Sequence, residues 1–410
     1  MVTATHPSRP LAGAATPGCP VRKLRPQGDR PGPPVEQVEE SAEERWVIRS
    51  FDTARQVIRD SDSVRQAGFA ADNVHRASAR MRPPILYLEG LQHRKQRKAA
   101  ARLFAPKVVE GYREMMEQLS DHLVASVRAD RPIDLSRLSW RMAAQVTAQV
   151  VGLTNSSVTA MSSRLNAFFE GDPMRTGWDP RSMVRLLRTQ SALLRFFTLD
   201  VKPAIRARRR NPGEDVISQL IAQDFNDVDI LTECVTYGAA GMVTTREFIT
   251  VAAWYLLDDA VLLDRYRRVD IAERLQILEE ILRLEPVVGH LYRRTVREVA
   301  LPGPDAPTLA VGTLIDLDVR AINIDSLTVG ADASQLCPGR NLPSSVPPPV
   351  MSFGDGNHRC PGAPLAIMEA EIFLSTLLKR DLVFNGPPTI QWNHLSAGYD
   401  LDDFIIRLRS

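Results

Sequence analysis

This sequence of 410 residues contains few cysteines, and no two of them are closely spaced. Its four cysteines form no Cys-x-x-Cys motif, so a structural zinc site is not expected. A disulfide framework is not expected either, because such frameworks stabilise small secreted domains. Both absences favour a reducing compartment, and we expect a cytoplasmic protein. The four residues are Cys19, Cys234, Cys337 and Cys360.

The sequence also lacks a membrane-targeting signal and a strong charge of one sign. Residues 1–35 contain eight prolines and no apolar run like that of a secretory signal or a membrane anchor. We expect this segment to be a flexible lead-in to a single domain over residues 36–410. Lys plus Arg totals 51 and Asp plus Glu totals 49, a balance that gives no signal for nucleic-acid binding.

Most of the remaining chain has the periodicity of helices, so we expect a mainly α fold with a small β region. Asp52 is expected to cap a short helix that reaches Ile58, and short strands are expected at 46–49, 296–301 and 308–317. The predicted helices cover 92–104, 108–129, 138–152, 157–169, 181–209, 214–223, 229–257, 271–284 and 363–379.

The segment from Phe353 to Pro364, FGDGNHRCPGAP, carries the strongest chemical signal. Its glycines permit positive φ angles and a close approach of the backbone to a flat ligand. Pro364 lies where a helix begins, so Cys360 directly precedes a helix N-terminus, where free N–H groups and the helix dipole stabilise an anion. We therefore expect a lowered thiol pKa. For an isolated cysteine, a generic reactive thiol or an inert buried one would be the alternatives.

This segment matches the cytochrome P450 signature Phe-Gly-x-Gly-x-His-x-Cys-x-Gly at every fixed position. From about Trp46 onward the chain resembles bacterial members of that family, in particular those that tailor natural products. The resemblance implies a helix-rich triangular domain with haem b between the central helix and the cysteine-side helix. Cys360 would be the axial thiolate and the metal ligand, and His358 would reach a haem propionate. The implied cofactor-binding residues of the segment are Phe353, Gly354, His358, Cys360 and Gly362.

Glu280 and Arg283 form a second motif, Glu-x-x-Arg, whose side chains share one helix face. On a surface such a pair contributes only about 0.3–0.5 kcal/mol. In the resembled family the motif forms a buried triad with a later arginine, and Arg340 is the candidate for that role.

A third motif, His93-x-x-x-Arg97, places two basic side chains on one helix face, where they could hold a carboxylate. A solvated basic face is the alternative. The resemblance implies that the pair binds a haem propionate and that the surrounding basic residues receive an acidic electron donor. That donor would be a ferredoxin with its reductase, since no flavin domain follows Ser410.

Either Arg293 or Arg294 is expected to reach the other propionate, and the local spacing fits both. The substrate pocket is expected along residues 68–90, 168–178, 286–291 and 396–402 and the central helix, by analogy with the fold. The aromatic residues Phe168, Phe169 and Trp178 could equally belong to the core.

The central helix departs from the family pattern at one catalytic position. Gly241, Thr244 and Thr245 match the pattern, but Val243 stands where an acid is usual. In the family, the acid and the following alcohol deliver protons during oxygen activation. Thr244 could still hold a water for this purpose. Gly238 and Gly241 share a helix face, which indicates either tight helix packing or a close ligand.

Two readings of the activity follow from Val243. One is ordinary monooxygenation of a small apolar or aromatic natural product, with protons arriving through Thr244 and water. The other is oxidative coupling, in which substrate N–H or O–H groups take part, as in family members that couple tryptophan-containing cyclic dipeptides. The alternatives are a peroxide-using or otherwise non-monooxygenase haem-thiolate enzyme, and a non-catalytic haem sensor.

Overall fold

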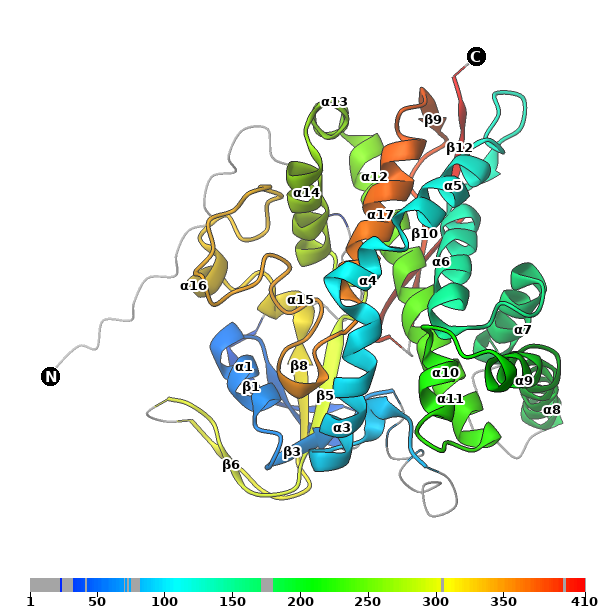
Figure 1. Ribbon diagram of the computed structural model, residues 1–410. Helices are drawn as coiled ribbons and strands as arrows, with labels where there is room; N and C mark the ends of the chain where they lie inside the picture. The colour runs from blue at the N-terminus through cyan, green and yellow to red at the C-terminus, as the bar shows by residue number, and fades with distance from the viewer. Residues whose placement is uncertain are drawn as a thin grey trace, which may run out of the picture.

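The computed structural model describes residues 23, 32–40, 43–69, 71, 74, 82–170, 180–303, 306–393 and 396–409. Helices dominate it, with a small β region at one side (Figure 1). The α-helices are α1 (Phe51–Arg59), α3 (Gly90–Ala100), α4 (Pro106–Glu110), α5 (Arg113–Val124), α6 (Leu135–Val151), α7 (Val158–Glu170), α8 (Pro180–Phe196), α9 (Lys202–Arg210), α10 (Val216–Ile221), α11 (Asp227–Gly238), α12 (Thr244–Asp258), α13 (Ala260–Arg268), α14 (Ile271–Leu284), α15 (Val319–Ile322), α16 (Ser326–Val329) and α17 (Ala363–Leu377).

The largest sheet has the strand order β1-β2-β8-β5-β3, in which only β2 and β8 pair in parallel. Its strands are β1 (Val35–Glu40), β2 (Glu43–Ile48), β3 (Val64–Gln66), β5 (His290–Thr295) and β8 (Leu314–Asp318). The smaller sheets are formed by β4 (Ile133–Asp134) with β9 (Leu382–Phe384) and β12 (Ile405–Leu408), by β6 (Val299–Ala300) with β7 (Thr308–Leu309), and by β10 (Thr389–Asn393) with β11 (Gly398–Asp402).

The largest hydrophobic cluster lies where α5, α6, α14 and α17 surround α12 (Figure 1). Each helix contributes side chains with no exposed surface. Burial of one such side chain stabilises the fold by about 1.5–3 kcal/mol. Packing therefore holds the central helix α12 in place on several sides, and this fixes the positions of the residues at its two ends. Examples are Met116, Met142, Ile249, Ile281 and Phe373.

The predicted helices are confirmed in outline, and two of the long ones contain an unpredicted wide turn. The run 229–257 consists of α11 and α12, joined by a π-helical turn at η4 (Ala239–Val243). The run 181–209 consists of α8 and α9, joined by a similar turn at η3 (Phe197–Val201). The sequence analysis also missed α13 and most strands. Asp52 lies inside the first turn of α1, whose N-cap residue is Ser50, so its expected capping role is wrong.

Most of the proline-rich segment 1–35 lies outside the described residues. Lys23 is described, and its backbone N–H donates to Glu285 Oε1 at 2.8 Å and to Tyr255 Oη at 2.8 Å. Its ammonium also pairs with Asp258. The lead-in therefore contacts the ends of α12 and α14 at this residue. Within the part of the chain that the structure covers, no helix has the length and apolarity needed to cross a membrane.

Candidate functional site

Cys360 lies between a turn η5 (Gly356–His358) and the first turn of α17. Its backbone N–H donates to Phe353 O at 2.8 Å, which closes the segment into a compact loop. Gly354 and Gly356 have φ angles of 67° and 64°, which residues with a Cβ rarely adopt. Asp355 fastens the loop to α1 through two arginines, Arg55 and Arg59, each 3.0 Å away.

Cys360 is an exposed residue, although protein atoms surround much of its thiol. Burial raises its pKa, although the N–H groups of Gly362 and Ala363 and the charge of Arg97 act in the opposite direction. The expected net lowering of the thiol pKa is therefore wrong, because desolvation outweighs the helix N-terminus. A metal ion would shift this balance, since coordination deprotonates a thiol. An exposed cysteine at a helix start, with two N–H groups directed at its sulfur, fits the axial ligand of a haem.

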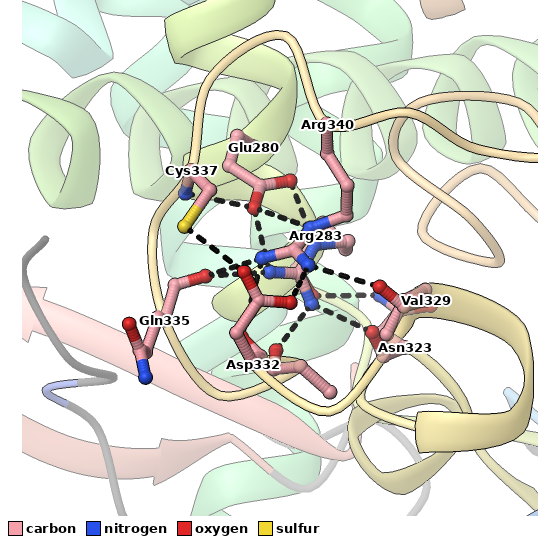
Figure 2. A network of polar contacts seen from close by, with 9 residues as sticks. Glu280, Arg283, Asn323, Val329, Asp332, Gln335, Cys337 and Arg340 are labelled. Carbon is pink, nitrogen blue, oxygen red and sulfur yellow. Dashed lines mark hydrogen bonds and ion pairs between the residues drawn. The ribbon is translucent and has the colours of Figure 1, made fainter. Parts of the chain in front are cut away.

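Behind the loop, Glu280 and Arg283 form a fully buried bidentate ion pair, with both nitrogen–oxygen distances at 2.7 Å (Figure 2). Arg283 also donates to the carbonyls of Asn323, Ala333 and Gln335 at 2.7–2.9 Å. All five of its N–H groups are thereby used. The surface-pair alternative for this motif is excluded, because Arg283 has no exposed surface.

Arg340 completes the expected triad, with its Nε 3.1 Å from Glu280 Oε1 (Figure 2). The same carboxylate oxygen accepts the backbone N–H of Cys337 at 3.0 Å. The guanidinium of Arg340 also pairs with Asp332, which closes the segment between these two residues. The ion pair therefore holds together α14 and the segment from Val329 to Arg340.

Asn323 transmits this network to the cysteine loop. Its side chain accepts the N–H of Met351 at 2.8 Å and donates to Ser352 Oγ at 2.8 Å. Ser352 in turn donates to Leu282 O at 2.9 Å. Phe353 follows Ser352 directly in the chain, and its carbonyl accepts the backbone N–H of Cys360. A short series of hydrogen bonds therefore connects Arg283 to the loop that carries the thiol. No sequence motif had pointed to Asn323.

A carboxylate cradle lies next to the loop, formed by His93, His358, Gln66 and Arg293. The rings of His93 and His358 stack at 4.1 Å. The cradle holds the carboxylate of Glu89, whose Oε2 is 3.2 Å from His358 Nε2 and whose Oε1 accepts Gln66 N–H at 2.9 Å. Burial opposes ionisation of Glu89, but His358 outweighs it and lowers its pKa. A haem propionate has the same chemistry, so these residues fit the expected cofactor.

His93 differs from the expectation in its charge. Burial beside His358 lowers its pKa to about 4, so at neutral pH it is a neutral hydrogen-bonding ring and not a second cation. Arg97 is half-buried and lies near the Cys360 thiol, and burial lowers its pKa. The sequence analysis missed Glu89, although its position four residues before His93 places it next to that side chain in a helical turn.

The structure separates Arg293 from Arg294 by the alternation of strand β5. Arg293 is buried, donates to Tyr292 O at 2.8 Å and to Gln66 Oε1, and lies near Glu89 in the cradle. Burial lowers its pKa to about 10. Arg294 is on the other face of the strand and donates to Gly312 O at 2.9 Å. Of the two, Arg293 is the one placed to bind a propionate.

The variant Arg293→Ala is expected to weaken haem binding by about 10- to 100-fold, as loss of an outer-shell partner does at metal sites. The matched variant Arg294→Ala removes the neighbouring arginine and should leave binding unchanged. Haem content after gel filtration, and haem titration of the apoprotein, measure the effect. Equal loss in both variants, or none in Arg293→Ala, would contradict the assignment.

On the central helix, the two glycines have a role in helix packing, whereas Thr244 has a hydroxyl that can take part in chemistry. A Cβ at Gly241 would lie 2.5 Å from Thr147 Oγ1 of α6, and one at Gly238 would lie 2.5 Å from Leu165 of α7. Tight helix packing therefore explains both glycines. Thr245 is buried. Val243 ends the π turn, and Thr244 follows it with its hydroxyl donating to Ala240 O at 2.5 Å.

Two of the expected pocket segments meet in the structure. An added Cβ at Gly398 would lie 2.0 Å from Val287 O, and one at Gly289 would lie 2.3 Å from Ala397 O, so the segments 286–291 and 396–402 touch. Phe169 packs against a hydrophobic core cluster, which agrees with the alternative that it belongs to the core and does not line the pocket. Trp178 and much of 68–90 lie outside the described residues.

Comparisons with known proteins agree with this geometry. The family model described as Cytochrome P450 matches residues 275–384. The chain is 28% identical over 369 residues to the cytochrome P450 monooxygenase PikC of Streptomyces venezuelae, covering 84% of this chain and 80% of PikC. It is 28% identical over 300 residues to the cyclomarin C epoxidase CymV of Salinispora arenicola, covering 70% and 71%. The crystal structure of cytochrome P450 MoxA from Nonomuraea recticatena matches with a TM-score of 0.76 at 20% identity, covering 92% of this chain and 93% of MoxA.

Proposed function

Since the chain belongs to the cytochrome P450 family, and is thus an oxidoreductase that carries haem iron on an axial cysteine thiolate, we propose that Cys360 is this ligand. The observation that carries this assignment is an exposed cysteine, Cys360, just before α17 and beside a carboxylate cradle. When bound, the haem supplies reductive activation of dioxygen, which strong electron donation by the thiolate favours.

The chain's own residues hold this cofactor and shape the space above it. His358 and Arg293 would bind the propionates, with His93 as a neutral partner, and Arg97 would carry positive charge near the thiolate. Amides of Gly362 and Ala363 hydrogen-bond the sulfur and tune its potential. Thr244 donates to Ala240 O, so its oxygen remains able to accept a hydrogen bond from a water or a ligand.

The enzyme acts in secondary metabolism, and its proposed substrate is a small apolar or aromatic natural product. PikC and CymV, named as a monooxygenase and as an epoxidase of cyclomarin C, support this class of chemistry. An aromatic cluster next to the touching pocket segments favours flat aromatic substrates. In it, His290 stacks on Tyr292 at 6.1 Å and meets Trp392 edge-on at 6.4 Å.

The finer choice is between hydroxylation and oxidative coupling, with tryptophan-containing cyclic dipeptides as the candidate substrates for coupling. Val243 supports coupling, because a substrate N–H can donate a proton that valine cannot. The same residue supports the second candidate, a peroxide-using enzyme, because peroxide already carries the protons that an internal acid would supply.

The electron donor in this proposal is an acidic ferredoxin, reduced by its reductase in the cytoplasm. Four basic side chains on and next to α3 are exposed, and none forms an ion pair with another described residue. Because Arg97 of the same helix lies near the thiol, this surface is on the cysteine side of the site. Opposite charges would steer the donor there. Free thiols at three of the cysteines are compatible with a reducing compartment. The basic residues are Arg94, Lys95, Lys98 and Arg102.

A spectral screen tests the substrate class. Purified holoenzyme is titrated with cyclic dipeptides that contain two, one or no tryptophan, and the Soret band is followed. We expect a shift only with the tryptophan-containing compounds. Turnover with ferredoxin, its reductase and NADPH should then yield a dimer that has lost two hydrogens.

Hydroxylated monomer as the sole product would contradict coupling, and the absence of any shift would contradict this substrate class. Turnover with hydrogen peroxide but none with the reduced ferredoxin would favour the peroxide-using enzyme instead. These outcomes are independent of the carbon monoxide spectrum, which tests haem-thiolate ligation by itself.

A further inference from the structure

Glu247 is a buried carboxyl on the same stretch of helix as the position that lacks its acid. It follows Thr244 by three residues and Val243 by four, and such spacings bring side chains together on one helix face. Its exposed fraction is 0%. Glu and Asp are almost never fully buried without a partner or a role. The carboxyl group therefore lies one helical turn from where the usual acid would be.

One oxygen of Glu247 is fixed and the other is not. Oε2 accepts the backbone N–H of Leu401 in β11 at 2.7 Å. Oε1 is 3.2 Å from Arg246 Nε, but it makes no hydrogen bond with any described residue. A carboxyl with one oxygen anchored and one oxygen uncommitted can carry a proton on the second oxygen.

The surroundings favour the protonated form at neutral pH. Burial raises the pKa of Glu247 to about 8, with Asp400 and Asp402 acting in the same direction. Arg246 and the N–H of Leu401 oppose this effect without reversing it. Glu247 is thus an acid below about pH 8, and after losing its proton it becomes a carboxylate that the same two donors stabilise.

A polar connection leads from Glu247 to the protein surface. Arg246 donates to Leu401 O at 2.9 Å and pairs with Asp402, whose side chain is 41% exposed. An arginine holds such a chain in place but does not itself release a proton. Because Asp402 is partly exposed, this chain fixes Glu247 two side chains away from the protein surface, where solvent water can restore its proton.

We propose that Glu247 is the proton-supplying residue that replaces the missing acid at position 243. This inference rests on the proposed haem-thiolate function. Hydroxylation consumes dioxygen, two electrons from the ferredoxin and two protons, and yields hydroxylated substrate and one water. Coupling of two substrate molecules consumes the same dioxygen, electrons and protons, and yields the dimer and two waters. Glu247 gives a proton through a water held by Thr244, becomes a carboxylate, and recovers a proton from solvent water. Glu247 acts through Thr244 and does not touch the substrate.

The first test reads the protonation state of Glu247 without turnover. Infrared spectra of the holoenzyme are recorded between pH 6 and pH 10, and the spectrum of Glu247→Gln is subtracted from that of the wild type, which removes the bands of other buried carboxyls such as Glu233 and Glu369. The difference should contain a protonated carboxyl C=O band that fades as pH rises through about 8. Glutamine keeps an acceptor for Leu401 N–H, so the fold is preserved. A difference spectrum without this band would overturn the proposal.

Glu233→Gln is the matched control. Glu233 is also buried, also accepts one backbone N–H, that of Ile85, and also has a pKa raised to about 8 by burial. It lies on α11, about three helical turns before Thr244. Its own infrared band should be lost in Glu233→Gln while turnover stays at the wild-type level.

The second test compares two ways of driving oxidation of the compound that gives the largest Soret shift in the screen above. In Glu247→Gln, ferredoxin-driven turnover should fall about 100-fold, as expected for loss of a general acid, and should lose its decline above pH 8. Peroxide-driven turnover should stay within about twofold, because peroxide carries its own protons. Unchanged ferredoxin-driven turnover, or an equal loss in Glu233→Gln, would overturn the proposal. Loss of the carbon monoxide band in wild type would instead contradict the haem-thiolate function.

Discussion

Replacing Cys360 by serine is expected to abolish the red-shifted Soret band that reduced haem-thiolate proteins give with carbon monoxide. A serine hydroxyl is a far weaker donor to iron than a thiolate, so the spectral signature of sulfur ligation should disappear entirely and turnover with it. The measurement is the difference spectrum of the reduced protein with and without carbon monoxide, at equal haem content.

The matched control for this experiment is Cys337→Ser. Cys337 is a partly buried cysteine outside any disulfide, in the loop held by Arg340, where its backbone N–H donates to Glu280 and its thiol donates to Asp332 at 3.5 Å. Its loss should leave the band intact. A normal band in Cys360→Ser would show that another residue binds the iron.

Replacing Arg283 by alanine is expected to have the largest effect on stability. The change removes five hydrogen bonds and leaves Glu280 as a buried carboxylate held only by Arg340 and one backbone N–H. Removing one partner of a buried ion pair costs about 3–5 kcal/mol. Because Asn323 connects the same network to the cysteine loop, haem should also be lost. Thermal unfolding and haem content measure both effects.

Arg274→Ala on the same helix provides the comparison. Arg274 is 21% exposed and donates to Glu371 and Ser375 Oγ at 3.2 Å and to Tyr266 O at 3.1 Å, so its loss should cost less than that of the fully buried Arg283. Arg283→Lys should remain closer to alanine than to wild type, because a lysine has three donors and no planar fork. If Arg283→Ala were as stable as Arg274→Ala, the network would not be what holds the loop.

The sequence allows good prediction where local rules decide the structure. The helix at 271–284 was predicted residue for residue, since Asp270 accepts the N–H of Glu273 as its cap and Pro286 follows its end. The cysteine loop and the Glu-x-x-Arg pair were also found, because fixed spacings carry their chemistry. Their partner Arg340 was correctly named from its place before the loop.

The remaining features depend on contacts between distant segments. The π turn before Thr244 accompanies the close packing of Gly241 on Thr147, which no local pattern reveals. The pKa of Cys360 could not be predicted, because the sequence indicates the amides of the helix start but not the amount of burial. Likewise, which of Arg293 and Arg294 lies in the carboxylate cradle depends on which face of strand β5 points toward it, and the local sequence does not determine this.

The network of Arg283 also bears on how far this chain can diverge. Three of its five hydrogen bonds end on backbone carbonyls, those of Asn323, Ala333 and Gln335, which every amino acid possesses. At positions 333 and 335 the side chains are therefore not what Arg283 recognises. What must be preserved is the path of the backbone, and hence the number of residues between α16 and Arg340. Such a segment tolerates exchange of its residues far better than an insertion of a single one.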